Sequence, residues 1–296
     1  MIDLSVLTTE KENPISTNLS SMSIIDSIEL FNNEDIKAVS CIKSQYNNIE
    51  KVIKLTVETL NNDGRIIYIG AGTSGRLGVL DAVECPPTFG VEYDKVIGLV
   101  AGGESAFGIP KEDIEDSEEV IIKDLKNINL KKNDILIGIA ASGRTPYVIG
   151  GLKYAKTKGC NIASIVCNFD SEIKSICENT IEIVPGPEIL TGSTRLKAGT
   201  ATKLVLNMIS TISMIQIGKV YKNFMVDVQL SNKKLVQRGI NIITSVTGCS
   251  EKLAQETLSI ANNSVKVAIV MILYNMDYEM AIKSLEHVKG RIDNIN

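Results

Sequence analysis

Short runs of apolar residues alternate with helix-like segments through the middle of the chain. Near-continuous apolar strands separated by helices are typical of a parallel sheet that is covered on both faces. Five such runs predict an α/β fold with a doubly wound, flavodoxin-like parallel sheet, which binds ligands beyond the carboxyl ends of its strands. The five predicted strands are Arg65–Ile69, Val96–Val100, Asp134–Ile139, Ile162–Val166 and Ile181–Val184.

Apolar residues at helical spacing lie on both sides of this central region. From Ser23 to Leu60 they recur every three or four positions, which predicts two or three helices. We expect a break near Asn32-Asn33 and an end at residues 62–64 (Asn-Asp-Gly). Residues 1–20 are polar and aperiodic, and we expect them to be extended. After the last strand the pattern predicts a long helix and four shorter ones, at 193–219, 231–247, 250–262, 264–275 and 277–290.

These changes of pattern divide the 296 residues into three parts. We expect an N-terminal helical segment over residues 1–50, the sheet domain over residues 51–225 and a C-terminal helical domain over residues 226–296.

Composition narrows the class of protein. The net charge is −4, and the acidic N-terminal fifty residues make a nucleic-acid-binding surface unexpected. Neither a run of about 18 uncharged apolar residues nor a signal-peptide pattern occurs, so we expect no membrane contact and a cytoplasmic location. The six cysteines show no C-x-x-C spacing and no cluster with histidine. We therefore expect reduced, buried thiols and no metal site.

A glycine-rich loop follows the first predicted strand and opens a helix. Its sequence, GAGTSGR at residues 70–76, matches the G-x-G-x-x-G pattern of dinucleotide sites. Those sites also need an acidic residue about 20 positions further on, and Glu104 lies well beyond that spacing. The hydroxyls of Thr73 and Ser74 and the guanidinium of Arg76 instead favour a compact phosphate group at the helix N-terminus. A dinucleotide site and a turn without a ligand remain the alternatives at this point.

A second loop of the same kind follows the third predicted strand. It reads AASGRTP at residues 140–146, and Pro146 is favoured in the first turn of a helix. In a doubly wound sheet the first and third strands are neighbours, so both loops should face one crevice. Ser142, Gly143 and Thr145 would then add donors for a phosphate of about −1.5 to −2 charges.

The helix after the first loop carries a candidate acid. Pro86 and Pro87 follow Cys85, so we expect this helix to end near Cys85. Glu84 would then lie at the negative end of the helix dipole, where a protonated carboxyl is favoured, as a general acid requires. A surface glutamate without a role is the alternative.

Three segments together resemble a known family: residues 68–90, 140–148 and 191–206. They are similar to the N-acetylmuramic acid 6-phosphate etherases, which are built on the sugar isomerase (SIS) domain. The motif GAGTSGRLGVLDA-x-ECPPT is highly specific, and the similarity covers nearly the whole chain. Val83 departs from the pattern, because a small hydroxyl residue is expected there.

The resemblance implies a lyase that removes the D-lactyl ether of N-acetylmuramate 6-phosphate by elimination and then hydration. It implies no metal and no organic cofactor, a small phosphorylated amino sugar as the only ligand, and a homodimer. It maps the family's catalytic glutamates onto Glu84, as proton donor, and Glu115, as base. By itself the segment 113–117 (DIEDS) reads as the solvated, acidic start of a helix.

Two further candidates flank the hydroxyl-rich loop Gly192-Ser193-Thr194. Glu188 and Lys197 could touch substrate, and Lys197 could meet phosphate or an enolate oxygen, or could be a solvated helix residue. The only histidine, His287, lies in the polar C-terminal region, and we expect it to be solvated.

Other classes of protein remain open. An aldose–ketose phosphosugar isomerase uses the same fold and the same first proton abstraction. A non-enzymatic sugar-phosphate sensor could keep the phosphate loops but would not need both Glu84 and Glu115. A DNA-binding regulator with a sugar isomerase domain is disfavoured by the acidic N-terminal region.

Overall fold

The computed structural model describes residues 6–108, 112–230 and 232–295. The chain forms two compact units. The first comprises residues 1–83 and 94–210, and the second comprises residues 84–93 and 211–296.

A five-stranded parallel sheet is the core of the first unit, in the order β2-β1-β3-β4-β5. Every residue of β1 and β3, the two strands that precede the hydroxyl-rich loops, is buried, which explains their unbroken apolar sequences. The predicted doubly wound sheet is therefore confirmed. The strands are β1 (Ile66–Gly70), β2 (Val96–Val100), β3 (Ile135–Ala140), β4 (Asn161–Val166) and β5 (Thr180–Glu182).

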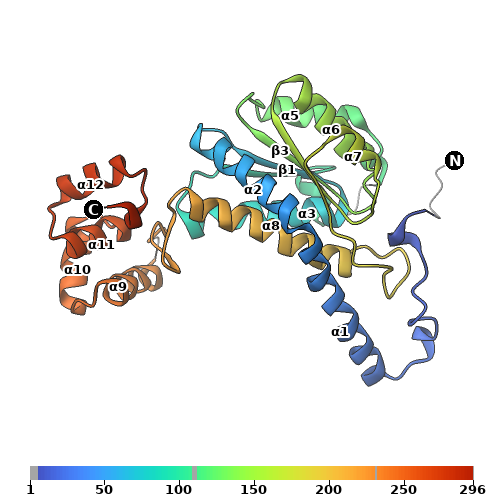
Figure 1. The fold of residues 1–296 in the computed structure, drawn as a ribbon, viewed down its shortest axis with the longest axis horizontal. Coiled ribbons are helices and arrows are strands. Elements are labelled where there is room, and N and C mark those ends of the chain that lie inside the picture. Colours follow the sequence, from blue (N-terminus) through green and yellow to red (C-terminus); the bar gives the residue numbers. More distant parts are fainter. Residues whose placement is uncertain (1–5, 109–111, 231, 296) are drawn as a thin grey trace. The chain divides into compact units, whose positions relative to one another are not determined.

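Helices cover both faces of this sheet (Figure 1). On one side lie α2 (Tyr46–Asn61), α3 (Gly72–Phe89) and α8 (Lys197–Gln216). On the other side lie α5 (Glu118–Asn127), α6 (Pro146–Thr157) and α7 (Glu172–Ile176). The contact between α3 and β2 depends on Gly98, because a Cβ there would lie 2.4 Å from the Cα of Val79. This close approach sets the position of α3 against the sheet.

The N-terminal region differs from its prediction in two ways. Helix α1 runs without a break from Ile24 to Ser40, and a short 3-10 helix, η3 (Cys41–Gln45), joins it to α2. The predicted break at Asn32-Asn33 was wrong, because asparagine lowers helix propensity by less than about 1 kcal/mol and both side chains stay exposed. Residues 6–21 are also not simply extended, since they include two 3-10 helices, η1 (Thr8–Glu10) and η2 (Leu19–Ser21).

The expected end of α3 near Cys85 was wrong as well. The helix continues through Pro86 and Pro87 to Phe89, and Gly90 follows it with φ of 61°. Both prolines fall in the last turn and a half, where the helix has little length left to be disrupted. Glu84 therefore lies inside α3 and not at its end.

The second unit is mainly helical. A small antiparallel hairpin, β6 (Val220–Tyr221) with β7 (Phe224–Met225), precedes its helices and was not predicted. The four predicted helices are confirmed, and a side chain just before each one caps its first turn. They are α9 (Lys233–Thr247), α10 (Glu251–Ile260), α11 (Val265–Tyr274) and α12 (Tyr278–His287), followed by the 3-10 helix η5 (Ile292–Asn294).

Their buried side chains form a separate apolar core. Within the described ranges, no single helix is long and apolar enough to cross a membrane. Helices α10 and α11 pass that test of length and composition only together, with a bend of 115° between them.

Candidate active site

The first hydroxyl-rich loop is the start of α3. Gly72 has φ of 51°, which lets the chain turn directly from β1 into the helix. A Cβ on Gly75 would lie 2.5 Å from the carbonyl oxygen of Gly70, so only glycine permits this contact. Thr73 and Ser74 are half-buried in the first turn, beside backbone N–H groups that have no acceptor within the helix. This is the arrangement that binds phosphate at a helix N-terminus.

Arg76 holds a neighbouring loop in place. Its Nε and Nη2 both donate to the carbonyl oxygen of Ala106, at 3.1 and 2.6 Å. Ala106 belongs to the 3-10 helix η4 (Glu104–Phe107), which follows β2. The guanidinium therefore adds positive charge near the start of α3 and fixes the adjacent loop.

The second loop follows β3, the neighbour of β1 in the sheet, as the sequence predicted. Gly143 has φ of 69°, and a Cβ there would lie 2.3 Å from the Cβ of Ser171, so both its backbone conformation and this close approach require glycine. The Ser142 hydroxyl accepts a hydrogen bond from the backbone N–H of Arg144 at 3.2 Å. Pro146 is the first residue of α6, which agrees with its predicted role.

Glu115 is close to this second loop. It ends the short helix α4 (Glu112–Glu115) and is half-buried. The Thr145 hydroxyl, itself only 7% exposed, donates to Oε1 of Glu115 at 3.2 Å. The solvated interpretation of this acidic stretch is therefore wrong for Glu115, whose carboxylate is held at the edge of the sheet beside the phosphate-type loop.

Glu84 lies elsewhere on α3. At 1.5 Å per residue, it is about 18 Å along the helix axis from Gly72. Its side chain is exposed, and two large apolar neighbours on the same helix, Leu80 at 51% and Val83 at 57%, are exposed with it.

Glu188 and Lys197 belong to a buried ionic cluster at the start of α8. The Glu188 carboxylate accepts hydrogen bonds from the backbone N–H groups of Lys197 and Ala198, at 3.0 and 2.8 Å. Burial raises the pKa of Glu188, while these two N–H groups act to lower it. Lys197 is 1% exposed, and its Nζ lies 2.5 Å from Oε2 of Glu34 on α1. The solvated interpretation of Lys197 is therefore wrong.

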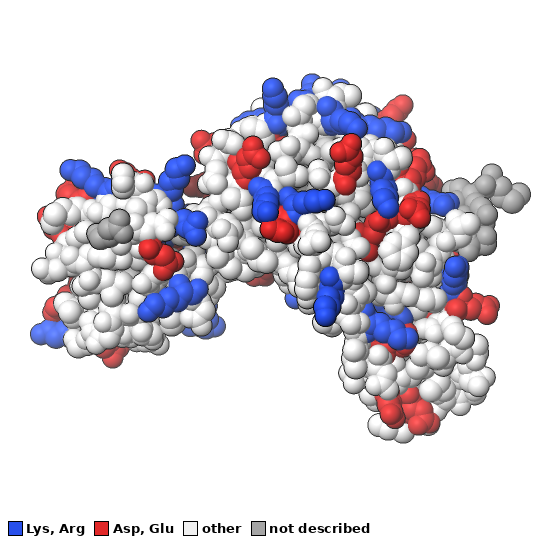
Figure 2. Space-filling model, viewed as in Figure 1, with Lys and Arg blue, Asp and Glu red and all other residues white. Residues whose placement is uncertain are grey.

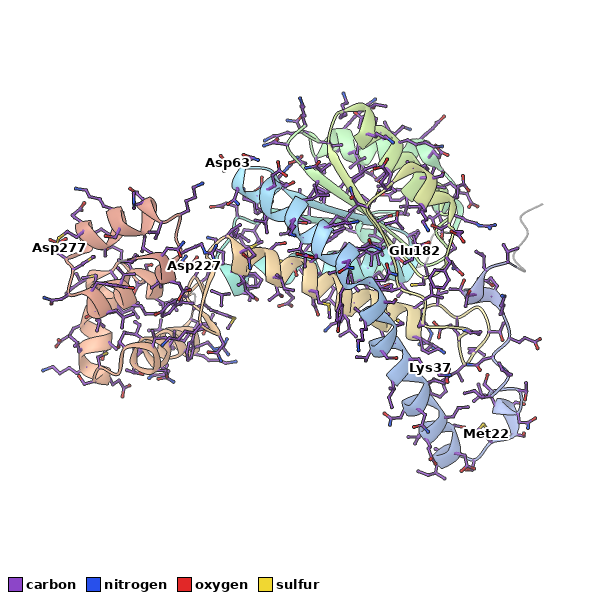
Figure 3. All side chains as sticks on the ribbon, in the orientation of Figure 1. Met22, Lys37, Asp63, Glu182, Asp227 and Asp277 are labelled. Carbon is purple, nitrogen blue, oxygen red and sulfur yellow. The ribbon has the colours of Figure 1, made fainter. Side chains whose placement is uncertain are left out.

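Glu34 accepts hydrogen bonds from several directions. Besides Lys197 it pairs with Lys37, labelled in Figure 3, and with Nδ2 of Asn13 at 2.9 Å. Burial acts to raise the pKa of Glu34, but these partners outweigh burial and hold it below the usual value of 4.5. The cluster is next to the first loop, because a Cβ on Gly199 in the first turn of α8 would lie 3.6 Å from Cγ2 of Thr73.

The N-terminal segment reaches the same edge of the sheet, which the sequence did not indicate. Nδ2 of Asn168, just after β4, donates to Oγ1 of Thr9 at 3.0 Å and to the carbonyl oxygen of Ala141 at 2.9 Å. The Ser16 hydroxyl donates to the carbonyl oxygen of Ile189 at 2.8 Å. The only available signal was that Asn168 is a polar residue directly after a buried strand, like the residues of the other two loops.

Where the structure describes the chain, no three His, Cys, Asp or Glu side chains are grouped closely enough to hold a metal ion. His287 is exposed, as expected. All six cysteines are free, and four of them are buried. Burial raises the pKa of Cys167 to about 12 and that of Cys160 to about 11, so both thiols stay protonated at neutral pH.

The sheet order and the paired loops define a sugar isomerase (SIS) domain protein. The chain matches the SIS domain family over residues 115–212 and the N-terminal SIS domain of glucokinase regulatory protein over residues 48–156. Residues 222–267 match the C-terminal lid domain of glucokinase regulatory protein. Phosphoheptose isomerase from Neisseria gonorrhoeae shares the fold, with a TM-score of 0.51 at 16% identity over 64% of this chain and 99% of that one.

Closer relatives define the family. N-acetylmuramic acid 6-phosphate etherase from Francisella tularensis subsp. holarctica is 55% identical over 95% of this chain and 96% of that protein. The protein of the same name from Bacillus mycoides is 53% identical over 96% of this chain and 97% of that protein. The chain therefore belongs to the N-acetylmuramic acid 6-phosphate etherase family.

Proposed function

We propose that this chain is a carbon–oxygen lyase that cleaves the D-lactyl ether of N-acetylmuramate 6-phosphate. The products are N-acetylglucosamine 6-phosphate and D-lactate, which places the reaction in amino-sugar catabolism and cell-wall recycling. The family membership supports this activity. The observation that carries the mechanism is the carboxylate of Glu115, held by Thr145 beside the loop that resembles a phosphate site.

The chemistry requires one base and one acid. In the open-chain sugar the proton on carbon 2 is α to an aldehyde, so a carboxylate can remove it. The departing lactate oxygen on carbon 3 must gain a proton, and water then adds to the unsaturated aldehyde. Each assisted proton transfer contributes roughly 10²–10⁴-fold. Glu115 is the base and Glu84 is the proton donor in this proposal.

The two loops bind the 6-phosphate. Thr73, Ser74, Ser142 and Gly143 supply hydroxyl and backbone donors at two adjacent strand ends. Thr145 links the two functions, because the same loop that faces the phosphate also orients Glu115. Arg76 adds charge and holds the loop after β2. Glu188 and Lys197 form the start of α8 beside these loops, so we assign them a positioning role and no substrate contact.

The distance along α3 supports a model in which Glu84 acts in another copy of the chain. The phosphate of a bound sugar would lie at the start of α3, whereas Glu84 is about 18 Å further along that helix. A hexose phosphate is much shorter than that distance. Leu80 and Val83 expose apolar surface next to Glu84, and contact with a second copy would bury it. We therefore infer a homodimer in which each crevice takes Glu84 from its partner.

Helix α1 offers further surface for the same contact. Ile24, Ile25, Ile28, Ile36 and Val39 are all more than half exposed. Ile24 and Ile28 also line a groove of about 510 Å³ on this helix. Exposed apolar residues this dense on one helix are typical of a subunit interface.

The rest of the proposal follows from the sequence. We assign the phosphosugar-binding domain to residues 51–225, between a helical segment (1–50) and a helical domain (226–296). The elimination needs no metal and no organic cofactor, and the substrate is the only small-molecule partner. Basic and acidic side chains are interspersed on the face shown in Figure 2, which does not favour nucleic acid as a partner. We propose a cytoplasmic location, as expected for a sugar-phosphate enzyme.

The test separates the two glutamates. Incubation of the chain with N-acetylmuramate 6-phosphate should release D-lactate, which a phosphosugar isomerase or a sensor would not do.

In deuterated water, Glu84→Gln should make little D-lactate but should still exchange the hydrogen on carbon 2, because the base is intact. Glu115→Gln should lose both reactions. Proton NMR of recovered substrate measures the exchange, and a lactate assay measures D-lactate formation. Exchange by Glu115→Gln without exchange by Glu84→Gln would make Glu84 the base and Glu115 the proton donor. Normal turnover by both variants would show that neither glutamate is catalytic.

A further inference from the structure

Asp81 is a buried carboxylate on the same helix as Glu84. It is 6% exposed and accepts hydrogen bonds from Nδ2 of Asn207 at 2.7 Å and Oγ of Ser210 at 3.0 Å, both on α8. The hydroxyl of Tyr68, on β1, is a further partner of this carboxylate. One side chain thus ties α3 to α8 and to strand β1 of the sheet.

Burial of the Asp81 carboxylate makes its hydrogen bonds restrict the rotation of α3. It raises the pKa of Asp81, while the hydrogen bonds from Asn207, Ser210 and Tyr68 act to lower it, with a smaller effect from Lys203. A buried carboxylate is costly unless donors surround it. The donors come from fixed positions on two other elements, so the bonds form well at only one rotation of α3 about its axis.

The helix is less well supported just beyond Asp81. Pro86 and Pro87 have no backbone N–H, so the carbonyl groups of Ala82 and Val83 lack their usual partners four residues ahead. Glu84 lies within this weakened turn. Its direction therefore depends on side-chain contacts that hold α3, and Asp81 makes such contacts one turn before it.

We propose that Asp81 is a positioning residue that fixes the rotation of α3 and thereby aims Glu84 at the leaving oxygen. A helical side chain ends about 5–6 Å from the helix axis, so a rotation of only 10° moves it by about 1 Å. A displacement of that size can cost a reaction about a hundredfold. The inference rests on the proposed function, because it gives Asp81 its role through Glu84.

The experiment uses the two reactions that separate Glu84 from Glu115. Asp81→Asn in the full-length chain should lower D-lactate formation at least tenfold, because proton donation is misdirected. Exchange of the carbon 2 hydrogen in deuterated water is measured at saturating substrate, so that a change in phosphate binding at the start of α3 does not enter the rate. It should stay within about twofold of the wild type, because the base is not on α3. Ser210→Ala, which removes one donor from α8 and leaves α3 unchanged, should shift the ratio of lactate to exchange in the same direction by less. If Asp81→Asn does not fold, Ser210→Ala decides the question alone.

The matched control is Asp124→Asn. Asp124 accepts a hydrogen bond from the Tyr147 hydroxyl at 2.8 Å, but it belongs to α5 on the other side of the sheet. Its loss should lower the midpoint of urea unfolding and leave the ratio of lactate to exchange unchanged. Equal loss of both reactions in the Asp81 and Ser210 variants would assign them a merely structural role and overturn the inference. Absence of both reactions in the wild type would instead overturn the proposed function, and this inference with it.

Discussion

Ser142 is a hydroxyl residue in the loop after β3, and the residues that follow it hold it in place. The backbone N–H of Arg144 donates to its oxygen, and the glycine that follows it packs against Ser171. The oxygen accepts one hydrogen bond from the protein, so its own proton can go to another acceptor. This is the geometry that a phosphate donor needs.

Ser142→Ala should therefore weaken binding of the phosphorylated sugar. The expected loss is roughly 1.5–3 kcal/mol, the usual contribution of a hydrogen bond to a charged group. Titration calorimetry with N-acetylglucosamine 6-phosphate measures it, and Ser175→Ala serves as the control because that exposed hydroxyl donates to the carbonyl oxygen of Glu172 in α7. Unchanged affinity in Ser142→Ala would exclude a phosphate contact.

At the scale of elements, the start of α8 is held by the buried cluster of Glu34, Glu188 and Lys197. The Lys197 ammonium brings α1 and α8 together, and Glu188 caps the first turn of α8. Breaking a buried pair by removing one partner leaves an uncompensated charge, which costs more than the pair contributes.

Lys197→Met should destabilise the fold by about 3 kcal/mol, because the buried carboxylate of Glu34 loses its most buried partner. Urea unfolding at pH 7 measures the change. Lys54→Met is the matched control, since its pair with Glu50 is exposed and should contribute nothing measurable. A Lys197 variant as stable as the Lys54 variant would show that the cluster does not anchor α8.

The same cluster predicts a pH dependence. The folded pKa of Glu34 lies below its ordinary value of 4.5, so its ionised form contributes stability that is fully present above pH 4.5. That contribution is lost as the pH falls through the lower, folded pKa. The difference in unfolding free energy between the wild type and Glu34→Gln should therefore be constant near neutral pH and shrink below pH 4.5. A difference that grows on acidification would contradict the assignment.

At the scale of the whole molecule, the prediction concerns how two copies share a site. If each crevice combines Glu115 of one copy with Glu84 of the other, a mixed dimer of Glu84→Gln and Glu115→Gln contains one intact crevice. Co-expression of the two variants with different affinity tags, followed by tandem purification, should give about half of the wild-type activity per dimer, since one of two sites is complete. The two separate variants are the controls. An inactive mixed dimer would place both glutamates in one chain.

We also predict that the activity of the whole molecule does not depend on a metal ion. The proposed elimination uses two carboxylates and a carbonyl group of the substrate, so exhaustive treatment with a chelator should leave D-lactate formation intact. Activity that is lost to the chelator and restored by a divalent ion would contradict this mechanism.

The sequence by itself determined the sheet and the loops that bear the hydroxyl groups. The strands are continuous apolar runs, and the glycines and Pro146 sit where tight turns and a helix start require them. These are local properties, because a side chain's size or a backbone's freedom acts within a few residues. The four C-terminal helices were predictable for the same reason, since each has its own cap and its own apolar period.

Tertiary structure decided what the charged residues do. Lys197 and Glu115 look solvated in sequence, yet one is buried against Glu34 and the other is held by Thr145. Asp81 drew no attention in sequence, because its donors are more than a hundred residues away on α8. A carboxylate is stable in the interior only when distant groups surround it, and no local pattern records which groups those are. The fold brought these partners together.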